Sequence, residues 1–140
     1  MAEPGPRRPV ETGHSWRWPA VAGVVAAALA LVLGPLLLGG PQFVERVSVV
    51  NPSPYDIHVE VTGQDRDGWL SVTTADHGAT GVGLEVVDQG AVWIFRFLAQ
   101  GRDGGELRIT RRDLAQADWS FEVPAEVIDR IRDAGAPPTP

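Results

Sequence analysis

The sequence predicts a mainly β fold: an N-terminal transmembrane helix, then a small antiparallel β-sandwich or barrel-like domain with one or two short C-terminal helices. The first observation behind this prediction is that residues 20–38 contain no charged or strongly polar side chain. As a helix, this segment would be about 29 Å long, close to the ~30 Å hydrocarbon core of a bilayer. The second is that short apolar segments recur between turn residues after residue 41, which is typical of antiparallel sheets.

The apolar segment is interpreted as an uncleaved signal anchor that divides the chain. Residues 1–18 are rich in Pro, Gly and charge, which predicts a disordered cytoplasmic tail, and residues 19–40 are the transmembrane helix. An extracytoplasmic β domain over 41–123 follows, and then a short helix with a disordered Pro-rich end over 124–140. The alternative is a cleaved signal peptide, but Leu38 and Pro41 fit poorly around a cut after Gly40.

The arginines predict the orientation of this anchor. Arg7, Arg8 and Arg17 precede the apolar segment, whereas only Arg46 lies within fifteen residues after it. Because basic residues stay in the cytoplasm, the N-terminus is expected inside the cell and the β domain outside it. Trp16 and Trp18 flank Arg17, and these three residues are the candidate membrane-interface group, since indole rings favour the headgroup zone.

Small residues form a stripe on the predicted transmembrane helix. Ala22, Ala26, Ala30 and Gly34 are spaced by four residues and share one face. Such a stripe lets a second helix approach closely, so these residues are the candidate helix-pairing site. The alternative is that the stripe only reflects a segment rich in Ala and Gly.

The β strands are predicted from alternation and from the turns between them. In Ile57–Thr62 apolar and polar residues alternate strictly, the period of a half-buried strand. Val47 and Val49 indicate an earlier strand, which Asn51-Pro52-Ser53-Pro54 ends. Further strands are predicted over Trp69–Thr73, Val82–Val87, Ala91–Leu98, Glu106–Thr110 and Trp119–Val123, with turns at Asp67-Gly68, His77-Gly78, Gln89-Gly90 and Asp103-Gly104-Gly105.

Two short helices are predicted near the C-terminus. Thr110 caps a helix over Asp113–Ala117, and Pro124 occupies the first position of a second helix. The apolar stripe of that helix is Val127, Ile128 and Ile131, and Gly135 ends it. The segment Ala91–Leu98 is apolar on both faces, so we expect the facing sheet to cover one face and a helix the other.

Large aromatic residues are expected to fill the core of the β domain, since such side chains dominate protein interiors. They are Phe43, Trp69, Trp93, Phe95, Phe97, Trp119 and Phe121.

No motif in the sequence predicts catalysis, a cofactor or a metal site. The chain has no Cys, no G-x-S-x-G and no Gly-rich phosphate loop. His58 and His77 are too few for a zinc site, and Asp65-x-Asp67-Gly68 departs from the calcium-loop spacing. The Arg66-Asp67-Gly68 sequence recurs as Arg102-Asp103-Gly104, which allows a hypothesis of two similar turns that form a binding rim.

Charge restricts the partners. Residues 41–140 hold nine Arg against 16 Asp and Glu, and residues 1–40 hold three Arg against two Glu. An acidic domain is a poor fit to nucleic acid or to an anionic lipid surface. The expected partners are the lipid bilayer around the anchor and another membrane or envelope protein, which can be a second copy of this chain.

The arginine-rich tail, the single apolar helix, Asn51-Pro52-Ser53-Pro54-Tyr55 and Arg102–Leu107 together resemble small single-pass membrane proteins of high-GC bacteria that carry a compact extracytoplasmic β domain. This resemblance carries over no catalytic residue. It implies a membrane-anchored interaction or accessory module of the cell envelope. A structural protein that self-associates through its helix, and an enzyme with an unrecognised site, are the alternatives.

Overall fold

The computed structural model describes residues 40–140. The predicted membrane anchor, with the interface group and the helix-pairing stripe, lies outside the described residues. Within residues 40–140, none of the helices combines the length and the apolar character that crossing a membrane requires.

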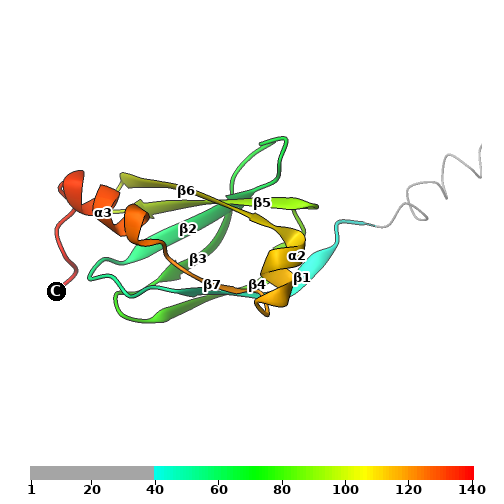
Figure 1. Ribbon diagram of the computed structural model, residues 1–140, viewed down its shortest axis with the longest axis horizontal. Coiled ribbons are helices and arrows are strands. Elements are labelled where there is room, and N and C mark those ends of the chain that lie inside the picture. Colours follow the sequence, from blue (N-terminus) through cyan, green and yellow to red (C-terminus); the bar gives the residue numbers. More distant parts are fainter. Residues whose placement is uncertain (1–39) are drawn as a thin grey trace, which may run out of the picture. The chain divides into compact units, whose positions relative to one another are not determined.

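The described residues form two β-sheets and two short helices (Figure 1). One sheet has the strand order β4-β1-β7 and the other has the order β3-β2-β5-β6. A mainly β domain with two short C-terminal helices is therefore confirmed. The bounds are β1 Phe43–Val50, β2 Ile57–Thr62, β3 Leu70–Ala75, β4 Thr80–Val87, β5 Val92–Ala99, β6 Arg102–Thr110, α2 Arg111–Gln116, β7 Ser120–Glu122 and α3 Ala125–Asp133.

The core lies between the two sheets and follows the alternation of the strands. β2 has the bounds that its sequence pattern predicts, and Ile57, Val59 and Val61 are fully buried. Trp93, Phe95 and Phe97 of the central strand β5 meet them, and Phe121 of β7 packs 4.4 Å from Phe95 between ring centroids. Both sheets thus contribute their inward faces to one core.

Glycines bring the two sheets together at the β3–β4 side. A Cβ atom on Gly83 would lie 2.7 Å from the backbone oxygen of Val72, and one on Gly81 would lie 2.8 Å from Cα of Ala75. A side chain at either position would collide with β3 backbone. Because these two residues have no side chains, β4 can approach β3 closely, and the two sheets meet at this side of the sandwich.

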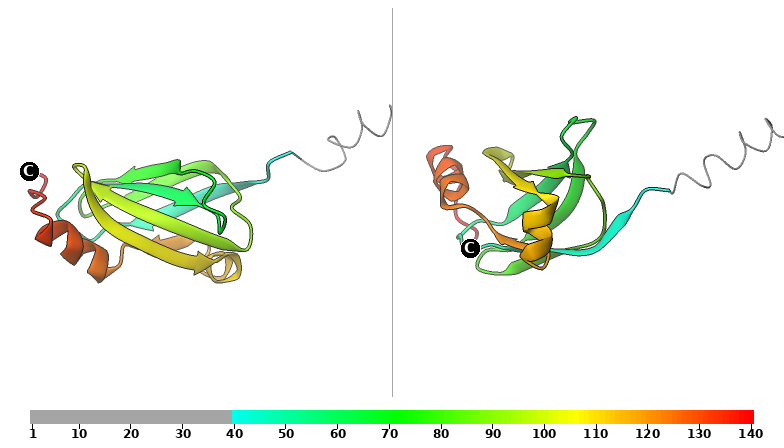
Figure 2. Two further views of the ribbon diagram at one scale, coloured as in Figure 1. Left: turned by 90° about the horizontal axis from the view of Figure 1, so that it is seen from above. Right: turned by 45° about the vertical axis from the view of Figure 1, so that its right-hand side comes forward.

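Helix α3 covers the opposite side, beside β6 (Figure 2). Val127 and Ile131 are buried there, and both would meet a Cβ atom on Gly104 at 2.9 Å. The predicted turn at Asp103-Gly104-Gly105 is therefore wrong: these residues belong to β6, and the hairpin turns at Gln100-Gly101. Helix α3 begins one residue after Pro124, which is its N-cap, and Gly135 follows its end with φ +74°.

A loop, not a helix, covers the outer face of β5. The segment 63–69 leaves β2 and crosses this face, where Arg66 makes two hydrogen bonds to Glu106 of β6 and the ring of Trp69 lies 4.3 Å from the Arg96 guanidinium. Beneath it, Ile94 is 2% exposed. The outer face of β5 is apolar because the segment 63–69 lies over it, an arrangement that the sequence pattern does not reveal.

The C-terminal end has a defined place, although its composition predicts disorder. Ala136 is buried, the Thr139 backbone N–H donates to the Pro54 carbonyl, and the Thr139 hydroxyl accepts from the Asp56 N–H. These contacts fix the Pro-rich end against the loop between β1 and β2.

Candidate functional site

One end of the β-sandwich gathers the candidate functional features. By the strand pairing, the start of β1, the loops 63–69 and 88–91, and helix α2 all lie at this end (Figure 1). We call it the β1 end, because the chain reaches the domain here. The loops 51–56, 76–79 and 100–101 and the C-terminal residues lie at the other end.

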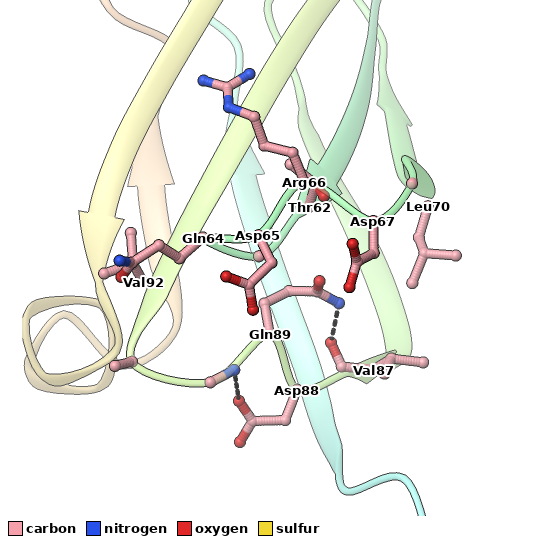
Figure 3. Close-up of a pocket in the computed structure, with 14 residues that line it drawn as sticks. Thr62, Gln64, Asp65, Arg66, Asp67, Leu70, Val87, Asp88, Gln89 and Val92 are labelled. Carbon is pink, nitrogen blue, oxygen red and sulfur yellow. Dashed lines mark hydrogen bonds between the residues drawn. The ribbon is translucent and has the colours of Figure 1, made fainter.

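A first depression, of about 530 Å³, opens at the β1 end between the loops 63–69 and 88–91. Asp65 and Asp67 extend from one loop toward the segment 87–89 of the other (Figure 3). Asp88 is engaged elsewhere, since it accepts hydrogen bonds from the Gly90 N–H and from Arg111, both at 2.9 Å. Within residues 40–140, no group of three or more potential ligand residues could hold a metal ion.

A second depression, of about 570 Å³, is the β1 groove. It is lined by the first half of β1, by one residue of β4, and by the start of α2 with the turn that follows it: Phe43, Val44, Glu45, Arg46, Leu84, Arg111, Asp118 and Trp119. Its apolar groups are Phe43, Leu84 and Trp119, and its charged groups comprise two cations and two anions. Arg111 lies over the Trp119 ring, 5.4 Å from its centroid.

Two exposed apolar side chains line this groove. Phe43 is 57% exposed and Leu84 is 70% exposed, and Leu70 and Val82 are the other large apolar residues of the described chain that are exposed. The prediction that Phe43 is a core residue is wrong, as is the same prediction for Trp69, which lies against Arg96 on the outer face of β5 and outside the core cluster. Phe43 is the first residue of β1 and points away from the core, which begins at Val44.

The strand β1 has an incomplete neighbour beside this groove. It pairs with β4 from Phe43 to Val50, but with β7 only from Ser48 to Val50. Within residues 40–140, no strand pairs with the β7 side of residues 43–47. Asp118 and Trp119, just before β7, both have left-handed φ, at 53° and 55°. Such backbone is uncommon for residues other than Gly, and it lies directly before the first residue of β7.

The histidines that the sequence singled out lie apart from these depressions. His58 faces outward on β2, 3.1 Å from the Thr74 hydroxyl. His77 pairs with Asp56 at 2.9 Å, at the other end of the sandwich. The hydrogen bonds from His77 hold the pKa of Asp56 below its ordinary value, and they tie the loop 76–79 to the loop between β1 and β2.

The hypothesis of a rim formed by two Arg-Asp-Gly turns is wrong. Arg66-Asp67-Gly68 lies in a loop at the β1 end, whereas Arg102-Asp103-Gly104 belongs to β6 at the other end of β5. The hydrogen bonds between Arg66 and Glu106 lower the pKa of Glu106 and hold the 63–69 loop in place.

The sequence contains one signal for the exposed residues of β4, namely glycines at alternate positions of the strand, which the alternation of apolar and polar residues alone does not reveal. In β4, Gly81 and Gly83 occupy the inward positions next to β3. Val82 and Leu84 therefore point outward, because side chains alternate along a strand. An apolar residue between two such glycines is a candidate for surface contact.

Comparison with known proteins gives no parallel for this domain: the chain matches no family model, no curated protein and no solved structure.

Proposed function

We propose that this protein is a membrane-anchored extracytoplasmic module that binds another protein of the cell envelope at its β1 end. The observation that carries this proposal is that the two exposed apolar side chains Phe43 and Leu84 line one groove, the β1 groove. Apolar side chains gathered at one place on a surface are typical of protein contact sites.

The position of this surface in the chain supports a partner in the same membrane. If residues 20–38 span the bilayer, only Gly39-Gly40-Pro41-Gln42 connect the anchor to β1. Four residues extend over at most about 14 Å, so the β1 end stays near the headgroups. A short tether also raises the effective concentration of the groove toward neighbouring membrane proteins.

The charge of the domain favours a protein over the lipid surface as the occupant. Residues 41–140 carry nine Arg against 16 Asp and Glu, and Asp65 and Asp67 lie exposed at the β1 end itself. Anionic headgroups attract basic segments and would repel these carboxylates. The exposed apolar residues are thus better matched by an apolar surface of another protein.

The orientation is tested with a single thiol. The chain has no Cys, and Ser71 is exposed at the start of β3. In intact cells, a membrane-impermeant maleimide should label the Ser71→Cys variant of the full chain. Labelling that appears only after lysis would contradict an extracytoplasmic domain.

The contact surface is tested by photo-crosslinking in intact cells. A photo-reactive amino acid at Val82, an exposed position of β4, should capture a defined partner. Leu84→Ser should reduce that product at least tenfold, whereas Thr80→Ser, an exposed position on the same strand, should leave it unchanged. Equal capture in both variants would contradict a contact at the groove.

A further inference from the structure

We infer that the β1 groove receives an extended segment of about five residues from a different membrane-anchored protein, which pairs parallel to residues 43–47 of β1. This inference rests on the proposed function and adds how the partner binds. It uses main-chain pairing to an exposed strand, a mode that gives affinity through the backbone and specificity through side-chain pockets.

The strand pairing defines the space for such a segment. β7 already lies next to β1, but only along Ser48–Val50, where the Ser48 N–H donates to the Trp119 carbonyl at 2.8 Å. The β1 groove lies across residues 43–46 of β1, with Leu84 of β4 on one side and Asp118 and Trp119 on the side where a longer β7 would continue. Unpaired strand edges are templates for another chain. The turn before β7 contains Asp118 and Trp119, both with left-handed φ, and it does not pair with residues 43–47 of β1.

The groove specifies the side chains of the segment. Its apolar groups, Phe43, Leu84 and Trp119, offer contacts for apolar side chains, and its charged groups balance, with Arg46 and Arg111 against Glu45 and Asp118. Arg111 also pairs with Asp88, at 2.9 Å, which leaves the groove slightly acidic. A segment without acidic residues and with apolar residues at alternate positions therefore fits best.

The direction follows from the place of β1 in the chain. β1 is the first strand after the apolar segment 20–38, and it starts at Phe43. The residues that follow another protein's membrane span would leave the bilayer beside it and run the same way. β7 is already parallel to β1 in this position, so the sheet accommodates a parallel neighbour here.

A second copy of this chain does not fit the same space. Its corresponding segment, β1, is a strand of eight residues, whereas β7 blocks the position beside Ser48–Val50. A second β1 would run into β7 after about five residues. The partner segment must therefore end or turn away at that point, which a different chain can do.

The test uses the full chain in its own membranes, with a photo-reactive amino acid placed singly at exposed residues. Phe43, Arg46 and Asp118 follow one another along the groove, and Ser71, exposed on β3, is the control. We expect at least tenfold more product from the three groove positions than from Ser71. Peptide mapping should place all three crosslinks within one short segment that follows a membrane span of a single partner.

The order of the crosslinks decides the mode of pairing. Parallel pairing requires that Phe43 reacts nearest the N-terminus of the partner segment and Asp118 nearest its C-terminus. The reverse order, a helical or scattered pattern, lipid adducts or a second copy of this chain would each overturn the inferred pairing. Absence of a protein partner from Val82 and from all three groove positions would overturn the proposed function itself.

Discussion

At the scale of single residues, Asn51 organises the loop between β1 and β2. Its side chain is 1% exposed, and its amide donates to the carbonyls of Tyr55 and Ala75 at 2.7 and 2.8 Å. Its carbonyl accepts from the Ser53 N–H and hydroxyl, at 3.1 and 2.6 Å. From the sequence, Asn51-Pro52-Ser53-Pro54 is predicted only to end a strand. In the structure, the buried side chain of Asn51 also connects the end of β1 to the following loop and to β3.

Replacement of Asn51 by Asp tests this link with almost no change of shape. The carboxylate would lack the two hydrogens that the carbonyls of Tyr55 and Ala75 accept, and it would bury a charge. Leaving buried carbonyls unpaired costs about 1–3 kcal/mol, and a buried charge costs more. We expect the free energy of unfolding, measured with denaturant at pH 7, to fall by several kcal/mol.

Gln64→Glu, the same change of charge at an exposed position, is the control, and its free energy of unfolding should stay within about 0.5 kcal/mol of the parent. Equal losses would show that net charge, not the hydrogen bonds, sets the effect.

At the scale of the elements, the β3–β4 contact depends on glycine. A methyl group on Gly83 would lie 2.7 Å from both the Val72 side chain and its backbone oxygen, and the backbone of β3 cannot yield without losing its pairing to β2. Gly83→Ala should therefore cost about 1–3 kcal/mol, the usual cost of overpacking. Gly40→Ala, where a methyl group meets nothing within 4 Å, should leave the free energy of unfolding unchanged. A Gly83→Ala variant as stable as the parent would contradict closure of the sandwich at this side.

The same scale shows what the sequence can predict about this fold and where prediction stops. Alternation predicts β2 to the residue, and Thr110 caps α2 through the Asp113 N–H, at 3.1 Å, as its spacing predicts. These features depend on neighbours in the chain. Asp103-Gly104-Gly105 carries the local signal of a turn, yet it lies in β6 because α3, more than twenty residues later, needs Gly104 for close packing.

The β1 groove is hidden from sequence patterns for a related reason. It exists because β7 is three residues long while β1 has eight, and the pairing of these two strands is set by the whole fold. The helix-pairing and membrane-interface residues named from sequence lie before residue 40, and the hypothesised rim lies elsewhere in the domain. The structure adds Phe43, Leu84 and Trp119, whose apolar side chains carry no local signal of a contact site. Only the register of β1 against β4 and β7 shows that these residues line a groove and not the core.

At the scale of the whole molecule, two ion pairs link distant parts of the domain and predict a loss of stability in acid. Arg66 lowers the pKa of Glu106, ordinarily 4.5, and His77 lowers the pKa of Asp56, ordinarily 3.8. A carboxyl group whose pKa is lowered by folding stabilises the folded state above its unfolded pKa, and this contribution disappears as the pH falls through the folded value. The stabilisation from these two carboxylates should therefore be complete above about pH 5 and decline as the pH falls below about 4.

Neutral variants of these carboxylates separate this linkage from general acid effects. Glu106→Gln and Asp56→Asn should melt below the parent at pH 6. The differences should narrow as the pH falls from 6 to 3, because each carboxylate of the parent loses its charge as the pH falls through its lowered pKa. Both pairs are solvent-exposed, so the differences should be small and should shrink further at high salt. A difference that persists unchanged at pH 3 would assign the effect to packing.

The short connection before β1 allows a test of the proposed membrane anchoring. If the anchor spans the membrane, the β1 groove works only within about 14 Å of the headgroups, where a partner's juxtamembrane segment is available. Insertion of about twenty flexible residues after Gln42 would add a reach of roughly 25 Å and dilute the groove among many neighbours. Photo-crosslinking from Arg46 to the partner should then fall several-fold, while the melting temperature of the domain stays the same.

Insertion of the same linker after Pro140, at the opposite end of the sandwich, is the control and should leave the crosslink unchanged. Equal crosslinking in both insertion variants would mean that the groove finds its partner without help from the membrane, and that proximity to the bilayer is not part of how this protein acts.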